Sequence, residues 1–444
     1  MKKLVLTLFA AALCAPIMSA QPARAQAQAV NAFVNVTIVP MDSERTLAGQ
    51  TVIVQDGRIS AIGPVAQIAV PAGAQEIDGA GKFLIPGLAE MHGHNPPPGS
   101  SEETIARTYF LYVANGVTLV RSMLGWDGQQ ELREKVRRGE LLGPTLYLAG
   151  PSFNGGSVKT AAEAERKVRE QKKQGWDLLK VHPGVPRDAF DAMARTAHEV
   201  GIHFAGHVPA DVGLSHAIAS GQRTIDHLDG YVEQLGAGAA PVAPDKLGEV
   251  VRHTRAYGAG VVPTMVLWDT ILGAHEAKAL LAFDELKYVP AADVAAWKAN
   301  YERTVGAPDF KAAQARQLAA HRRTILKALN DGGVDILFGT DSPQIFSVPG
   351  FSIHREMQAM RAAGLSNFDI LASATRNVAS HLGEAGRFGT IVPGARADLV
   401  LLNANPLDDL GNVARRSGVM VRGLWLSERE IAARLDAIAT SLRK

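Results

Sequence analysis

Hydrophobic and polar positions follow two different periods along this chain and divide it into three regions. Residues 30 to 80 show the two-residue alternation of strands, over 33–39 and over a predicted hairpin of 50–55 and 58–62 around the turn Asp56-Gly57. Strand-like runs return at 397–402 and 419–423. The two terminal regions therefore predict one small β-sandwich domain built from both ends of the chain.

The central region alternates apolar strand-like runs with amphipathic helical segments such as 161–174 and 187–200. The predicted strands are 83–94, 116–123, 144–149, 177–182, 203–208, 224–228, 260–266 and 335–340. Eight strand–helix units over this length predict a (β/α)8 TIM barrel of the α/β class. A helical insertion over 269–326 follows the seventh strand, where insertions often shape a substrate pocket.

The N-terminus has the pattern of a secretory signal peptide. Lys2 and Lys3 precede the apolar run Leu4 to Ala15, which is too short for a permanent membrane helix, and Ala23-Arg24-Ala25 offers a cleavage pattern. The single cysteine, Cys14, lies in this segment, so the mature chain would contain no disulfide and no thiol nucleophile. We expect an exported bacterial protein, periplasmic or secreted, with no membrane attachment after cleavage.

These patterns predict five segments along the chain. They are a signal peptide at 1–25, the first part of the β-sandwich at 26–84, the barrel at 85–388, the second sandwich part at 389–428 and a C-terminal helix at 429–444. The formal net charge is only +2, and the basic residues are scattered. We therefore expect a small-molecule substrate and no nucleic-acid partner, while a homo-oligomer stays open.

Polar residues with metal-ligand chemistry stand at the ends of several predicted barrel strands. In His92-Gly93-His94 the two imidazoles share one face of a strand, and neutral imidazole is a common zinc ligand. This motif alone is equally compatible with two ordinary histidines near a turn. However, four further polar residues follow at later strand ends: Lys180, His207, His227 and Asp341. Since barrel active sites lie at the C-terminal strand ends, the whole set favours a functional site.

The motifs around these residues resemble the amidohydrolase superfamily. The similarity rests on the run 83–88 before His92-Gly93-His94, on Gly339-Thr340-Asp341, and on the later segments 393–400 and 405–407. Within the superfamily the chain is most similar to the branch of imidazolonepropionase-like and prolidase-like hydrolases. That branch includes enzymes that act on carboxylate-bearing amides and on ochratoxin.

The resemblance implies a site for two divalent metal ions, expected to be zinc. The implied ligands are His92, His94, Lys180, His207, His227 and Asp341. The first two histidines and Asp341 would bind the more buried metal, and the two later histidines the second. Lys180 would bridge both as a carbamate formed with carbon dioxide. A bridging hydroxide would be the nucleophile, and Asp341 would carry the proton to the leaving group.

The chain departs from this family pattern in two places. Glu90 stands where the family more often has aspartate, and the segment 150–156 lacks a histidine that prolidase-like members commonly show. The second departure weakens a dipeptidase assignment. His354 and Glu356, soon after the eighth strand, are candidates for supporting the site or the domain interface.

Three residues are candidates for binding the substrate. His182 shares a strand face with Lys180 and lies nearer the barrel mouth, so we expect it in the pocket. Tyr231 and Arg121 are candidates for holding a substrate carboxylate, with rim packing and a structural ion pair as their respective alternatives. Trp268 opens the insertion and is a candidate for the pocket wall, with core packing as its alternative.

The sequence thus predicts an exported metal-dependent hydrolase of an amide or peptide-like C–N bond. The expected substrates are carboxylate-bearing N-acyl amino acids, dipeptides or ochratoxin-like molecules. Hydrolysis of a cyclic amide, an imide or an ester on the same site is the first alternative, while Lys180 disfavours the mononuclear deaminases. A non-catalytic periplasmic binding protein is the remote alternative, because it would be expected to lack one or more ligands.

Overall fold

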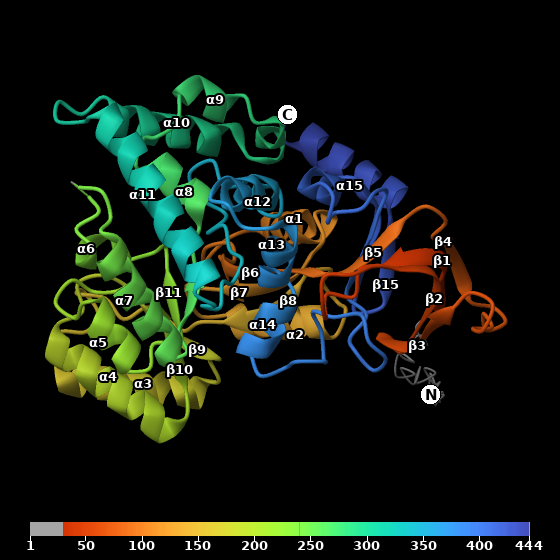
Figure 1. Ribbon diagram of the computed structural model, residues 1–444, viewed down its shortest axis with the longest axis horizontal. Coiled ribbons are helices and arrows are strands. Elements are labelled where there is room, and N and C mark those ends of the chain that lie inside the picture. Colours follow the sequence, from red (N-terminus) through yellow and green to blue (C-terminus); the bar gives the residue numbers. More distant parts are fainter. Residues whose placement is uncertain (1–29, 239, 444) are drawn as a thin grey trace, which may run out of the picture.

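The computed structural model describes residues 30–238 and 240–443 (Figure 1). The expected signal peptide at 1–25, with Cys14, lies outside these described residues. Within them, no helix combines the length and the apolar character that a membrane crossing requires.

One sheet is built from both ends of the chain, in the order β15-β14-β13-β5-β1-β2-β3 with β4 beside β1. Its strands are β1 (Asn31–Ile38), β2 (Leu47–Gln55), β3 (Arg58–Pro64), β4 (Gln75–Asp78), β5 (Phe83–Pro86), β13 (Leu399–Leu402), β14 (Arg416–Val421) and β15 (Leu424–Ser427). Alternate apolar residues such as Phe33, Val52 and Leu401 form its buried core. The separate β domain is thus confirmed, as one hydrogen-bonded sheet at one end of the molecule (Figure 1).

The single strand expected over 83–94 is wrong, because the chain forms two strands there. β5 ends at Pro86 and pairs in the outer sheet, whereas β6 (Leu88–Gly93) belongs to the barrel. Gly87 lies between them against Thr118, and a Cβ at this position would overlap the Thr118 side chain. The glycine therefore lets the chain pass from one sheet to the other at close quarters.

The barrel strands form two parallel sheets. The first contains β6, β7 (Val117–Ser122) and β8 (Thr145–Leu148), and the second contains β9 (Leu178–Val181), β10 (His203–Gly206), β11 (Thr224–Asp226) and β12 (Gly260–Val262). An isolated bridge between Ala149 and Leu178 joins the two sheets. All seven strands therefore run in the same direction around one core, as predicted.

The eighth predicted strand, 335–340, closes the barrel without forming a regular strand. Ile336 makes a single bridge with Val261 of β12. On the other side, the Met91 N–H of β6 donates to the Phe338 carbonyl at 2.8 Å. This segment therefore connects the last strand to the first and brings the residues that follow it to the same end as the other strand ends.

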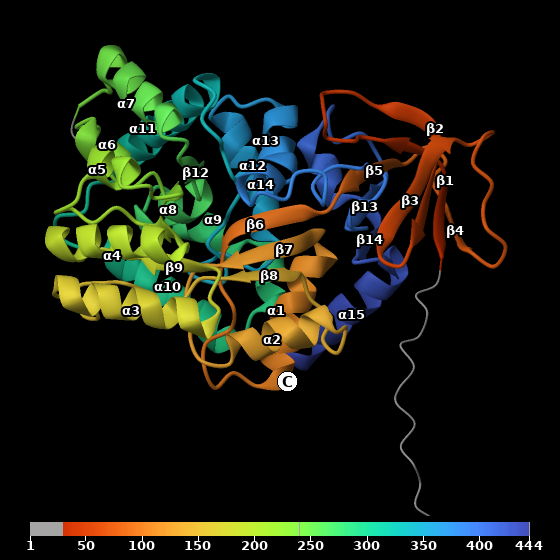
Figure 2. The ribbon, with the colours of Figure 1, turned by 90° about the horizontal axis from the view of Figure 1, so that it is seen from below.

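Helices cover the outside of the barrel (Figure 2). They are α1 (Glu102–Ala114), α2 (Gln129–Arg137), α3 (Ala161–Gln174), α4 (Arg187–Val200), α5 (Leu214–Ala219), α6 (Tyr231–Gln234), α7 (Pro244–Ala256), α8 (Met265–Ile271), α9 (Ala277–Leu281), α10 (Ala291–Val305), α11 (Ala312–Asp331), α12 (Ser352–Ala362), α13 (Asn367–Ser373) and α14 (Arg376–His381). A last helix, α15 (Glu428–Ser441), begins with a capping box of Ser427 and Glu430. The 3-10 turns are η1 (Asp284–Tyr288) and η2 (Leu410–Ala414).

Candidate metal centre

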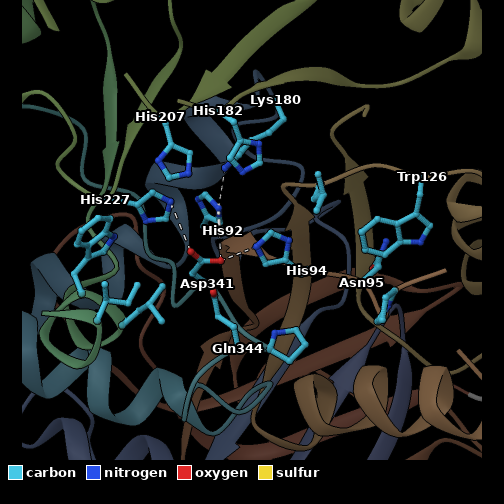
Figure 3. Close-up of a pocket in the computed structure, with 16 residues that line it drawn as sticks. His92, His94, Asn95, Trp126, Lys180, His182, His207, His227, Asp341 and Gln344 are labelled. Atoms are coloured by element: carbon cyan, nitrogen blue, oxygen red, sulfur yellow. Dashed lines mark hydrogen bonds and ion pairs between the residues drawn. The ribbon is translucent and has the colours of Figure 1, made fainter. Parts of the chain in front are cut away.

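Side chains at or just after the C-terminal ends of the strands β6, β9, β10 and β11 and of the segment 335–340 line one cavity of about 490 Å³ (Figure 3). All six residues predicted as metal ligands are among them: His92, His94, Lys180, His207, His227 and Asp341. Apart from the neighbours His92 and His94, they are far apart in the sequence, and the barrel brings them together. Whether these residues fit a metal ion follows from their donor atoms and the distances between them.

Three of these residues form a compact group. The Nε2 atom of His94 lies 2.6 Å from Oδ1 of Asp341, and Nε2 of His92 lies 3.8 Å from the same oxygen. One ligand atom from each residue lies within 4.8 Å of the others, which is close enough for a shared cation. This arrangement matches the ligand group expected for the more buried metal.

The remaining residues adjoin this group on one side. Nε2 of His227 lies 3.6 Å from Oδ2 of Asp341, and the His207 and His227 ring centroids are 4.5 Å apart. The Lys180 amine lies 3.1 Å from Nε2 of His92. Asp341 thus has histidines near both of its oxygens, and Lys180 lies beside the buried histidine.

Three histidines are held at their outer ring nitrogen. Nδ1 of His92 lies 2.8 Å from Asp226, Nδ1 of His207 lies 2.6 Å from Asp229, and Nδ1 of His227 lies 2.7 Å from the Thr264 hydroxyl; these contacts leave each Nε2 directed inward. Such outer contacts fix the tautomer and the ring plane of metal-binding histidines. The donor set therefore fits divalent metal ions.

The three supporting residues were not predicted from the sequence. Asp226 directly precedes His227, Asp229 follows it by two positions, and Thr264 stands at the end of the seventh predicted strand. A carboxylate beside a ligand histidine at a strand end is the signal that could have indicated the two aspartates, whereas Thr264 has no ligand histidine near it in the sequence.

Burial sets the protonation of the cluster. It lowers the pKa of His92 and His227 well below the usual range, and Lys180 contributes to the effect at His92. Both rings are therefore neutral at neutral pH, which is the form that binds metals. Burial also lowers the pKa of Lys180 to about 8, although Asp226 and Asp341 oppose this shift.

The backbone is unusual at three of these positions. His227, Thr264 and Asp341 have φ angles of 63°, 44° and 59°, in the left-handed region that non-glycine residues rarely adopt. Each of them follows a barrel strand; His227 and Asp341 line the cavity, and Thr264 contacts the outer nitrogen of His227. Such strain persists only where the surrounding structure enforces it, and it is concentrated at functional sites.

Glu90, where aspartate was the expected family residue, supports the centre from below. Its Oε1 accepts hydrogen bonds from the backbone N–H groups of His92 at 3.0 Å and Thr340 at 2.8 Å, and its Oε2 accepts from the Thr340 hydroxyl at 2.6 Å. Burial raises the pKa of Glu90 to about 8. The longer side chain thus links the first and last strands of the barrel directly beneath the ligands.

The three substrate-binding candidates have different surroundings in the structure. His182 lines the cavity, its ring stacks on His207 at 5.0 Å, and burial lowers its pKa to about 3. Tyr231 does not line it, because its buried hydroxyl bonds Thr254 at 2.9 Å on α7. The expectation that Tyr231 holds a substrate carboxylate is therefore corrected, in favour of packing.

Arg121 also lies away from the cavity lining. Its buried guanidinium donates to the Met91 carbonyl at 2.7 Å and to the Thr224 hydroxyl at 3.1 Å, and it lies 3.5 Å from Asp226. The barrel interior surrounds the side chain on all of these sides. The expected substrate contact is thus replaced by the alternative, a structural ion pair.

The later candidates fall into two groups. Trp268 lines the cavity with its neighbours on α8, and both carboxylate oxygens of Glu356 cap this helix through the N–H groups of Met265 and Val266, at 2.8 and 2.9 Å. His354 instead lies near β14, between Asn115 and Arg416. Of the predicted insertion 269–326, Ile271 is the residue that lines the cavity.

Comparison with known proteins agrees with this geometry. The profile described as the amidohydrolase family matches residues 83–426. "Adenine deaminase 3" of Rhizobium meliloti is 22% identical over 411 residues, covering 88% of this chain and 56% of that protein. This chain therefore spans little more than half the length of that curated relative.

Two solved structures share the fold. A bottromycin amidohydrolase is 25% identical with a TM-score of 0.74, and the match covers 93% of this chain and 90% of that chain. A Xaa-Pro dipeptidase with bound methionine in its active site is 20% identical with a TM-score of 0.68, over 90% of this chain and 100% of that chain. The (β/α)8 barrel with a separate β domain is confirmed by this similarity.

Proposed function

This chain belongs to the amidohydrolase family, as its strand-end motifs predicted. We propose that it hydrolyses an amide C–N bond of a small molecule. The reaction would use two bound divalent metal ions, and zinc is the expected metal. One observation carries the proposal. Four imidazoles, Asp341 and Lys180 meet in a single cavity, and three of the imidazoles are fixed from outside by Asp226, Asp229 and Thr264.

The roles of the chain's own residues follow from their positions. Metal ions bound in such a site polarise the substrate carbonyl and lower the pKa of water. Asp341 lies between His94 on one oxygen and His227 on the other, at the centre of the cluster. Its carboxylate accepts the proton of the attacking water and passes it to the amide nitrogen, which then leaves as an amine. The carboxyl of the product retains the oxygen of the water.

We further propose that Lys180 carries a carbamate. Its amine is fully buried 3.1 Å from His92, where a cation would repel bound divalent ions. The nitrogen lone pair would form a bond to the carbon of carbon dioxide and one proton would leave, so that Lys180 would offer two anionic oxygens to divalent cations. Carbon-13 labelled bicarbonate should give a carbamate signal in NMR that Lys180→Arg abolishes.

The test uses the protein expressed from the full sequence, so that any removal of the N-terminal segment is done by the host cell. We expect about two zinc-like ions per chain, loss of amidase activity with chelators and its return with zinc. Asp341→Asn should lower kcat by at least 100-fold, whereas the exposed control Asp408→Asn should not change it. A chain that hydrolyses no amide in a panel of neutral and carboxylate-bearing amides would refute the function.

The alternatives give different outcomes in the same experiment. Activity on hydantoins, lactones or esters, with none on open-chain amides, would support the first alternative on the same site. Tight solute binding by a metal-free protein would support a binding protein. The proposed export, to the periplasm or beyond, is tested separately by fractionation and by the N-terminal sequence of the mature chain.

A further inference from the structure

Beyond the predicted metal ligands, the wall of the cavity is largely apolar and aromatic, with Asn95 and Gln344 as its amide side chains. Trp126 follows β7, while Leu267, Trp268 and Ile271 come from α8, and together with Leu124 they surround the ligand residues. Gly125 fixes the loop that carries Trp126, because its N–H donates to the Gly150 carbonyl at 3.3 Å and a Cβ there would overlap this backbone. The part of the wall that carries Trp126 is therefore held in place by the backbone at Gly150.

This wall offers no cation to an anionic substrate group. Among the described residues that line the cavity, Lys180 is the only lysine or arginine, and it lies at the floor beside His92. Arg322 stacks on the Trp268 ring at 5.0 Å without lining the cavity. A carboxylate placed against such a wall would lose water without gaining the bidentate arginine contact that proteins normally supply.

The wall does offer a neutral hydrogen-bond donor. Asn95 lines the cavity and is 2% exposed, and its Oδ1 accepts a hydrogen bond from the Tyr109 hydroxyl at 3.1 Å (Figure 3). Its Nδ2 has no partner among the described residues, although buried amide groups are almost always bonded. A carbonyl or ether oxygen of a neutral substrate is the group that this N–H fits.

We propose that the site selects neutral amides with an aromatic group and discriminates against substrates with a free carboxylate next to the scissile bond. Trp126 and Trp268 stack on or enclose the aromatic group, and Asn95 donates to a neutral oxygen. This inference rests on the proposed function and narrows its substrate class, because it replaces the carboxylate-bearing substrates that the family resemblance implied.

A matched substrate pair tests the inference. N-octanoyl-phenethylamine and N-octanoyl-phenylalanine contain the same scissile amide and differ only by the carboxylate. With the zinc-loaded full chain, we expect kcat/KM to be at least about tenfold higher for the neutral compound. A higher value for the carboxylate, or equal values, would overturn the inference while leaving the proposed amidase intact. If the protein cleaved neither of these compounds and no other amide, the proposed function would instead be refuted.

Variants of Trp126 distinguish a loss of aromatic stacking from a loss of activity toward all amides. Trp126→Ala should lower kcat/KM for the phenethylamide about tenfold more than it lowers kcat/KM for N-octanoyl-methylamine, which has no ring, and the metal content should stay the same. Trp126→Phe, which keeps an aromatic face, should restore most of the loss. An equal loss on both amides from Trp126→Ala, without rescue by phenylalanine, would contradict aromatic selection.

Discussion

The Asp226 carboxylate holds the buried His92 ring, with Oδ2 2.8 Å from Nδ1 of the histidine. The other oxygen accepts a hydrogen bond from the Thr224 hydroxyl at 2.7 Å and lies 3.5 Å from Arg121. A line of buried groups thus runs from Arg121 through the carboxylate to the imidazole. The Asp226 carboxylate in this line orients the imidazole, so that Nε2 of His92 faces the cavity.

Asp226→Asn should therefore weaken metal binding without removing a ligand. The amide has the same shape but lacks the negative charge that orients His92 and pairs with Arg121. We expect about 10- to 100-fold weaker binding of one metal, measured by chelator competition. Asp229→Asn, which removes the charge behind His207, should affect the other metal. Unchanged affinity for both metals in Asp226→Asn would contradict this positioning role.

Gly206→Ala should destabilise the barrel next to Lys180. Gly206 has a φ of 126°, and a Cβ there would overlap the Val181 carbonyl and lie 3.1 Å from Cδ of Lys180. Gly175 is the matched control, because its φ is 81° but nothing lies within 4 Å of the added Cβ. We expect a loss of about 1–2 kcal/mol for Gly175→Ala and a larger loss for Gly206→Ala in urea unfolding. Equal losses of unfolding free energy in the two variants would show that only the backbone strain matters and that the overlap with Val181 does not.

His354 should make the protein sensitive to mild acid. Burial, with a smaller effect of Arg416, lowers its pKa from 6.5 to about 3. Between these values the unfolded chain binds a proton that the folded chain does not, so the free energy of unfolding falls as the pH falls. The slope from this group is at most about 1.4 kcal/mol per pH unit.

His354→Gln is the variant that tests this effect, because glutamine can still donate to Asn115 and does not titrate. Urea unfolding at pH 7.5 and pH 5 should show a smaller difference in the variant than in the wild type. The same difference in both proteins would assign the acid sensitivity to other groups.

Glu356→Ala should alter substrate binding without touching the metals. It removes both acceptors at the start of α8, the helix that carries Leu267, Trp268 and Ile271. The buried N–H of Met265 loses its partner, at about 1–3 kcal/mol, and the partly buried N–H of Val266 loses its partner at a smaller cost. We expect a lower Tm, a KM raised more than kcat is lowered, and an unchanged metal content. Glu356→Gln keeps one good acceptor, so its Tm and KM should lie between those of the wild type and those of Glu356→Ala. A loss of metal would mean that the helix supports the ligands as well.

Much of this architecture was predictable because local sequence carries it. The period of two marks the outer strands, and the alternation of apolar runs with amphipathic segments marks the barrel units. Once the strands are placed, parallel direction brings their ends together, so His92 and Asp341 meet although they lie at opposite ends of the barrel sequence. That geometric rule is why all six predicted ligands lie in one cavity.

The errors concern contacts that depend on side-chain direction. Arg121 stands on a barrel strand and Tyr231 near a strand end, but Arg121 points into the barrel interior and Tyr231 toward α7. The supporting roles of Asp226 and Thr264 depend on the partner strand and on a left-handed backbone angle, which no local pattern specifies. The break at Gly87 likewise depends on the close approach of Thr118.

The position of β5 between β1 and β13 has a consequence for synthesis. β5 has its N-terminal neighbour as soon as it is made, but its other edge waits until residues 399–402 emerge from the ribosome. Until then the nascent chain carries an open strand edge beside the start of the barrel. Completion of this sheet is therefore a late event in folding, and loss of the last fifty residues would expose that edge permanently and favour aggregation.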